Sequence, residues 1–190
     1  MHGNGPIEYR IDNNGWLQPA RHCPSPNFNA RPSAQLIDLL VIHNISLPPG
    51  EFGGGFIEQL FTNNLDCTAH PSFAELRDLQ VSAHLLIDRD GAVTQFVAFT
   101  ERAWHAGKSS FDGRDNCNDF SIGIELEGAD TAAYSDAQYR ALAAVTAVLL
   151  AHFPGLNLDK IVGHCDIAPA RKTDPGPAFE WARYRQSIGA

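Results

Sequence analysis

The hydrophobic positions of this chain fall into short runs separated by long polar segments. Residues 36–43 (LIDLLVIH) are nearly all apolar, which is typical of a strand buried on both faces. Residues 81–87 and 92–97 form two further runs, and the DRDG turn between them predicts a β-hairpin. Residues 120–126 (FSIGIEL) alternate in character, and the Ile-Val pair at 161–162 begins another strand. These runs predict the strands of one sheet.

Two segments show helical spacing instead. Residues 136–153 are apolar around most of the helix, and a capping-box pattern, Ser135 with Gln138, precedes a Pro-Gly stop at Pro154. Apolar residues also recur at helical spacing in 56–61, where a short helix is expected. Because strands and helices follow one another along the chain, we predict an α/β fold with a mixed central β-sheet flanked by helices.

Length and composition limit the possibilities further. A chain of 190 residues with 44% hydrophobic residues can bury one sizeable core. We expect a mobile N-terminal extension at 1–14, rich in Asn and Gly, and a single domain at 15–190. A formal net charge of −8 argues against a nucleic-acid partner.

Compartment follows from the cysteines and from the N-terminus. The four cysteines are dispersed and suggest no disulfide framework. The N-terminus lacks the apolar segment of a signal peptide, and no apolar run is long enough to span a membrane. We therefore predict a cytoplasmic protein with no membrane partner. Nothing in the pattern suggests a coiled coil or an exposed apolar helix, so a monomer is expected.

Two histidines carry the most specific chemical signal. His43 and His164 both follow apolar strands, where open α/β sheets tend to place ligands, and Asp174 lies in the loop after His164. Three nitrogen and oxygen ligands with one open position are typical of catalytic zinc. A lone histidine at such a place is more often structural, and this spacing is no named short motif, so spacing alone leaves a metal site and hydrogen-bonded structure both open.

Other residues offer catalytic groups. Glu125 lies inside an apolar strand, where a carboxylate is either a general base or one half of a structural salt bridge. Glu127 is expected to be solvated or to pair with Arg114 or Arg102. Lys172 either pairs with Asp174 or stabilises an oxyanion. Cys165 is the competing nucleophile or ligand, which we interpret as a packed thiol.

Three residues are candidates for binding substrate. Asn44 follows His43 and can offer its amide, His84 lies in a predicted strand, and Trp104 lies on a glycine-bearing loop where it can stack on a sugar ring. His105, beside it, either joins that stacking surface or anchors the loop. For His84, a hydrogen-bonded strand histidine is an equal alternative.

At these residues the chain resembles a known family. The blocks VIHNISLPPGEFGG, SAHLLIDRDG, RAWHAG, CNDFSIGIELEG and GHCDIAPARKTDPGPAF, in this order, are similar to those of AmpD-type anhydro-N-acetylmuramyl-L-alanine amidases. The resemblance runs from about Gly15 to Tyr184. It implies a zinc amidase of the amidase-2 group, with the fold shared by phage lysozyme-type amidases and peptidoglycan recognition proteins.

The resemblance also assigns roles. It implies Zn²⁺ ligands at His43, His164 and Asp174, a catalytic glutamate at Glu125 and a catalytic lysine at Lys172. The implied substrates are anhydromuropeptides from cell-wall recycling, cut between the lactyl group of anhydro-N-acetylmuramic acid and L-alanine.

Three other functions stay open. The first is a peptidoglycan-binding module without catalysis, which the complete set of candidate ligands disfavours. The second is a periplasmic amidase acting on intact murein, which the missing signal segment disfavours. The third is a cysteine hydrolase using Cys165, which insensitivity to thiol alkylation together with loss of activity in chelator would exclude.

Overall fold

A six-stranded sheet forms the centre of the computed structural model, which describes residues 7–32 and 36–189. Its strand order is β12-β5-β11-β6-β7-β3. Strands β12, β5, β11 and β6 are parallel, and β7 and β3 run in the opposite direction. The bounds are β3 Arg21–His22, β5 Leu39–Ile45, β6 Leu85–Ile87, β7 Val93–Gln95, β11 Ser121–Glu127 and β12 Ile161–Gly163. The predicted mixed sheet is confirmed.

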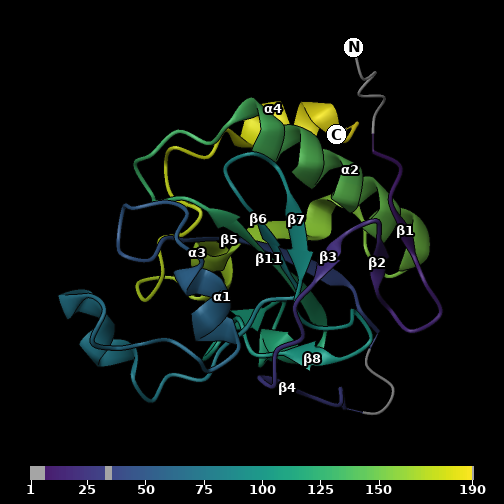
Figure 1. Cartoon of the computed structure of the whole chain (residues 1–190). Coiled ribbons are helices and arrows are strands. Elements are labelled where there is room, and N and C mark those ends of the chain that lie inside the picture. The colour runs from purple at the N-terminus through teal and green to yellow at the C-terminus, as the bar shows by residue number, and fades with distance from the viewer. Residues whose placement is uncertain (1–6, 33–35, 190) are drawn as a thin grey trace.

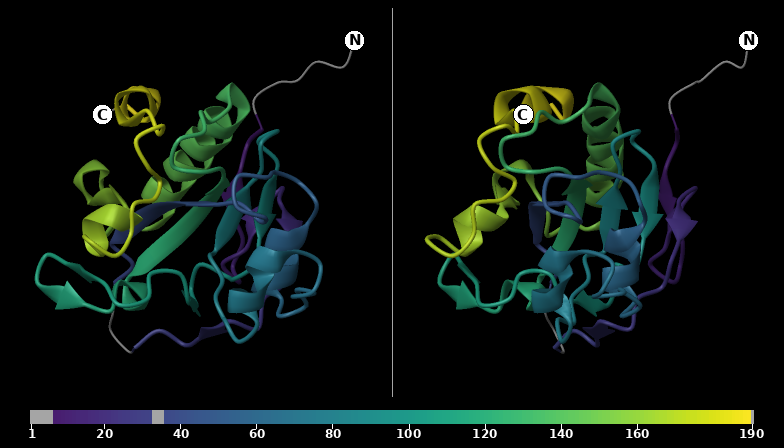
Figure 2. Two further views of the ribbon diagram at one scale, coloured as in Figure 1. Left: turned by 90° about the vertical axis from the view of Figure 1, so that its left-hand side faces the viewer. Right: turned by 60° about the vertical axis from the view of Figure 1, so that its left-hand side comes forward.

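Helices cover both faces of this sheet. Figures 1 and 2 show α2 (Asp136–His152) and α4 (Trp181–Ser187) together on one side, and α1 (Phe56–Phe61) with a 3-10 helix at Pro71–Leu76 on the other. The predicted helices at 56–61 and 136–153 are thereby confirmed. In α2 the Ser135 hydroxyl accepts from the Gln138 backbone N–H at 3.1 Å, which completes the predicted capping box.

Alternation along β11 separates the two faces. Ile122, Ile124 and Leu126 pack in the apolar core beneath α2. The residues between them form a polar row on the opposite face, and this row consists of Ser121, Gly123, Glu125 and Glu127. Successive side chains of a strand point to opposite faces, so every member of the polar row lies on the α1 side of the sheet.

The predicted strands differ from the observed ones mainly at their ends. Strand β5 starts at Leu39 and continues past His43 to Ile45, so His43 lies within the strand. The predicted run 81–87 contributes only Leu85–Ile87 to β6. The hairpin between β6 and β7 is confirmed as antiparallel.

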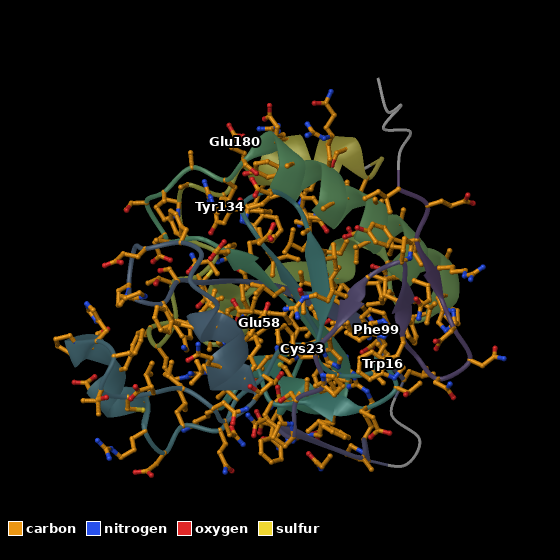
Figure 3. All side chains as sticks on the ribbon, viewed as in Figure 1. Trp16, Cys23, Glu58, Phe99, Tyr134 and Glu180 are labelled. Atoms are coloured by element: carbon orange, nitrogen blue, oxygen red, sulfur yellow. The ribbon has the colours of Figure 1, made fainter. Side chains whose placement is uncertain are left out.

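The N-terminal arm pairs more than its sequence indicates. Residues 1–6 of the predicted extension lie outside the described residues, and in the rest of it β1 (Arg10–Ile11) pairs with β2 (Leu17–Gln18). Strand β3 adds to the edge of the central sheet beside β7. The Phe99 N–H donates to the Gly15 carbonyl at 2.9 Å, and Figure 3 labels Trp16 and Phe99 on this side of the molecule.

Short elements complete the chain around this frame. In residues 7–32 and 36–189, no helix combines the length and apolar character that crossing a membrane requires. The remaining elements are β4 Phe28–Asn29, β8 Arg102–Ala103, β9 Ser110–Phe111, β10 Arg114–Asp115, α3 His164–Ile167, and 3-10 turns at Cys117–Asp119 and Leu158–Lys160.

Candidate metal and catalytic centre

Two histidines and one carboxylate meet at a buried point beside the sheet. His43 Nδ1 lies 3.0 Å from His164 Nδ1, and Asp174 Oδ2 lies 3.1 Å from each of these nitrogens. His43 is 1% exposed, His164 3% and Asp174 9%. His43 comes from β5 and His164 opens α3 directly after β12, and since β12 pairs with β5 the two imidazoles face each other. The structure therefore brings together the predicted ligand set.

The loop that carries Asp174 is fastened on both sides. The Asp174 carbonyl accepts from the Cys165 N–H at 3.0 Å. The carbonyl of the next residue, Pro175, accepts from the Asn44 side-chain amide at 3.0 Å and from the Tyr134 hydroxyl at 2.7 Å. Tyr134 lies near the start of α2, where Figure 3 labels it. These bonds hold the carboxylate against the end of β5.

Both imidazoles use their outer nitrogens in further contacts. His164 Nε2 donates to the Ala106 carbonyl at 3.1 Å, because a carbonyl can only accept. A neutral His164 therefore presents a lone pair at Nδ1, toward Asp174. His43 Nε2 lies 2.9 Å from Nδ1 of His105, so its Nδ1 also faces the centre of the cluster.

Electrostatics favour the ligand forms of these groups. Burial lowers the pKa of His43 to about 4, so its imidazole is neutral at physiological pH. Burial alone would raise the pKa of Asp174, but its close contacts with the imidazoles of His164 and His43 outweigh burial and keep this pKa below its usual range. Two imidazoles and one carboxylate match the three protein ligands that a catalytic zinc ion typically takes. Their ligand atoms all lie within 4.8 Å of one another, as a shared metal ion requires.

Glu125 lies next to this cluster on β11, in register with His43 of β5. Its side chain is buried, and Oε2 has no hydrogen-bond partner among the described residues. Burial raises the pKa of Glu125 well above its ordinary value, the negative charge of Asp174 raises it further, and the positive charge of Lys172 opposes both. A raised pKa makes a carboxylate a stronger proton acceptor, as a general base requires.

Lys172 lies two residues before Asp174 on the same loop. Its side chain is exposed, unlike the inward orientation that its oxyanion role assumes. Its charge still reaches the centre, since it lowers the pKa of both Glu125 and His43. The charge of Lys172 therefore acts on the groups of the cluster, while its exposed ammonium can contact a bound molecule.

Two expectations about neighbouring residues need correction. Glu127 is buried rather than solvated: it accepts from the backbone N–H groups of Gly53 at 2.6 Å and Arg89 at 3.3 Å. The expected partners form ion pairs elsewhere: Arg102 pairs with Asp119, and Arg114 pairs with Asp38. The second correction concerns Cys165, which lies in the first turn of α3, a helix that the sequence pattern does not predict. Burial raises its pKa, which disfavours a thiolate nucleophile and agrees with the interpretation as a packed thiol.

The three candidate substrate contacts lie in different settings. The side-chain amide of Asn44 donates to Asp130 Oδ1 and to the Pro175 carbonyl, so in this geometry it anchors the Asp174 loop. His84 is fully buried and hydrogen-bonded to the Gly123 N–H, which matches its structural alternative. Trp104 is half-buried and donates from Nε1 to the Asn29 side chain.

The contact partners of the two histidines are not predicted by the sequence. The pattern places His105 only as a loop residue beside Trp104, and it gives Ala106 no role. His105 and Ala106 come from a loop that is far from His43 and His164 in the chain. Every residue has a backbone carbonyl, so the contact made by Ala106 cannot be inferred from its residue type. The RAWHAG block draws attention to the segment but not to its contacts.

Known proteins share this architecture. A family model described as N-acetylmuramoyl-L-alanine amidase matches residues 32–177. The 1,6-anhydro-N-acetylmuramyl-L-alanine amidase AmpD of Escherichia coli is 61% identical over 171 residues, covering 90% of this chain and 93% of that protein. The AmpD of Haemophilus influenzae is 53% identical over 174 residues, covering 92% and 95%.

Solved structures agree with the sequence relatives. A crystal structure of a selenomethionine AmpD derivative matches with a TM-score of 0.91 at 58% identity, covering 94% of this chain and 98% of that one. The amidase AmiD of Escherichia coli, in complex with anhydro-N-acetylmuramic acid-L-Ala-D-gamma-Glu-L-Lys, matches with a TM-score of 0.60 at 28% identity, covering 95% and 65%. This chain therefore belongs to the N-acetylmuramoyl-L-alanine amidase family, and within it to the AmpD-type 1,6-anhydro-N-acetylmuramyl-L-alanine amidases.

Proposed function

We propose that this chain uses zinc to hydrolyse the amide bond between the lactyl group of anhydro-N-acetylmuramic acid and L-alanine in muropeptides released during cell-wall recycling. The observation that carries the proposal is the buried His43–His164–Asp174 cluster, beside which Glu125 Oε2 has no hydrogen-bond partner in residues 7–32 and 36–189. The anhydromuropeptide bound by AmiD supports the same substrate class. The cytoplasmic location and the monomeric state remain predictions from the sequence.

The ligand set suits zinc better than a harder cation. Magnesium and calcium prefer oxygen ligands, whereas two imidazole nitrogens and one carboxylate oxygen are typical of catalytic zinc. His43 and His164 would hold the ion through Nδ1, and Asp174 through Oδ2. When bound, zinc supplies a Lewis acid that polarises the scissile carbonyl and lowers the pKa of water to about 7.

The chain's own groups would then move the protons. Glu125 takes a proton from the attacking water, whose oxygen forms the new bond to the lactyl carbonyl carbon. The ammonium of Lys172 stabilises the negative charge that develops on the carbonyl oxygen. When the carbon–nitrogen bond breaks, Glu125 returns the proton to the alanine nitrogen, and a free carboxyl and a free amine remain. The raised pKa of Glu125 makes the carboxylate a stronger base toward water and helps it to hold the proton until the amine leaves.

The test combines metal content with turnover. Elemental analysis of the purified protein should give about one zinc per chain, the number that one three-ligand site binds. Release of free peptide from anhydro-N-acetylmuramyl-tripeptide should stop in chelator and return when zinc is added. His164→Gln should lose both zinc and turnover, and His152→Gln, at an exposed position on α2, is the matched control that should keep both. Full activity without zinc would refute the ligand assignment.

A further inference from the structure

The ring of His105 fills a place that the sheet leaves open for it. A Cβ on Gly123 of β11 would lie 2.4 Å from Nδ1 and 2.5 Å from Cγ of His105. The backbone of Gly123 does not have the positive φ that favours glycine, and a glycine inside a strand costs stability. The missing side chain at Gly123 is therefore needed for the imidazole of His105 to lie against the strand.

The ring also joins two polar groups through its two nitrogens. His105 Nδ1 lies 2.9 Å from Nε2 of His43, and His105 Nε2 lies 3.0 Å from the hydroxyl of Ser121. The rings of His43 and His105 meet edge to face, with centroids 5.0 Å apart and an interplanar angle of 88°. Ser121, Gly123 and the catalytic candidate Glu125 all belong to the polar row of β11.

Only one direction of these hydrogen bonds leaves His43 able to bind a cation. A neutral imidazole carries one N–H, so a free lone pair on Nδ1 requires the hydrogen on Nε2. Nε2–H of His43 then donates to His105 Nδ1, and Nε2–H of His105 donates to Ser121. The opposite direction would place a hydrogen on His43 Nδ1, pointing at Asp174, and would remove that ligand atom.

We propose that His105 is a positioning residue that fixes the tautomer and ring orientation of His43, so that Nδ1 is presented to the metal. The proposal rests on the proposed function, since it assumes that the cluster binds zinc. The carbonyl of the adjacent residue, Ala106, does the same for His164. The dipeptide 105–106 thus fixes the tautomer and ring orientation of both imidazoles of the cluster. Groups that hold metal-binding histidines in this way typically change metal affinity by 10–100-fold when removed.

Two substitutions separate hydrogen bonding from packing. His105→Phe keeps a flat ring against Gly123 but removes the acceptor, and leaves the buried N–H of His43 without a partner. His105→Asn loses most of the ring but can place Oδ1 near the position of Nδ1, where it can accept. If His105 only filled space, Phe would preserve zinc binding and Asn would weaken it, which is the reverse of the order we expect.

The experiment is a zinc titration of the three proteins against a chromophoric chelator, with urea unfolding of each metal-free protein as a check on folding. His105→Phe should bind zinc about 10–100-fold more weakly than the wild type, and His105→Asn should recover at least half of the lost binding free energy. Wild-type affinity in His105→Phe, or equal losses in both variants, would overturn the proposal.

Two further measurements keep the proposal testable if His105→Phe does not fold, and separate its failure from failure of the proposed function. If His105→Phe does not fold, Ser121→Ala takes its place, because it removes the far partner of His105 and leaves every imidazole intact; unchanged zinc affinity in Ser121→Ala would then overturn the proposal. A wild-type protein that binds no zinc would instead refute the proposed function, and with it the role of His105, so the two failures are distinguishable.

Discussion

Replacing Glu125 with Gln tests the catalytic assignment with the smallest change in shape. The amide keeps the volume of the carboxyl, so no cavity forms in this buried site. It cannot accept and return a proton, and a general acid–base group contributes typically 10²–10⁴-fold to the rate. We therefore expect turnover to fall by about 10²–10⁴-fold, which is a rise of about 3–5 kcal/mol in the activation free energy. Zinc content should stay unchanged, because Glu125 is not a member of the ligand set.

The same substitution should stabilise the metal-free protein at neutral pH. Burial raises the pKa of Glu125 in the folded state, whereas the unfolded chain keeps its ordinary value near 4.3. The stability of the wild type is then greatest below that ordinary pKa and falls as pH rises through the folded-state value. Gln at this position does not ionise, so Glu125→Gln removes this pH-dependent loss of stability. The gain should shrink as pH approaches 4.

Three measurements check this reasoning. Peptide release from anhydro-N-acetylmuramyl-tripeptide gives turnover, elemental analysis gives zinc, and urea unfolding in chelator at neutral and acidic pH gives stability. Glu127→Gln is the matched control: it lies in the same polar row, but its carboxylate accepts two backbone N–H groups, so its loss should lower stability and affect turnover far less. Near wild-type turnover in Glu125→Gln would refute the proton-transfer role of Glu125. Loss of zinc from this variant would refute the assumption that Glu125 is not a metal ligand.

Three further predictions follow from the geometry. Lys172→Met should lower kcat by about 10²–10³-fold, the cost of losing one oxyanion-stabilising group, with zinc content unchanged by elemental analysis. Cys165→Ser should keep wild-type turnover and remain inhibited by chelator, and loss of activity in it would revive the cysteine hydrolase. Ser135→Ala should lower the free energy of unfolding by about 0.5–2 kcal/mol, measured from the urea midpoint, because it removes the N-cap of α2 while peptide release stays unchanged.

Local pattern was enough to predict most of the fold. Strand β5, helix α2 and the β6–β7 hairpin each carry their signal within a few consecutive residues, as apolar runs, a capping box and a tight turn. Strand β3 carries none, because two residues cannot show alternation, and it exists only through its pairing with β7. Edge strands of this length are determined by the neighbouring strand and not by their own sequence.

The grouping of the three candidate ligands could be predicted because their chemistry is in their residue types. A histidine within or directly after a buried strand and a carboxylate in a proline-flanked loop are unusual enough to stand out, as His43, His164 and Asp174 do. Burial of Glu127 could not be predicted, because its backbone donors come from two separate loops, at Gly53 and Arg89. The sequence shows which groups can accept hydrogen bonds, but tertiary structure decides which donors reach them.

Strand β11 shows how the two kinds of information combine. Its alternation predicts a polar row, and the members that face the site differ in what they do there. The Ser121 hydroxyl lies 3.0 Å from His105 Nε2, Gly123 leaves room for that ring, and Glu125 Oε2 has no hydrogen-bond partner among the described residues. An alanine at position 123 would preserve the alternation and the strand, and yet would collide with the imidazole that holds His43. Glycine at position 123 is thus a specific requirement of the proposed metal site, and only the position of the His105 ring shows why.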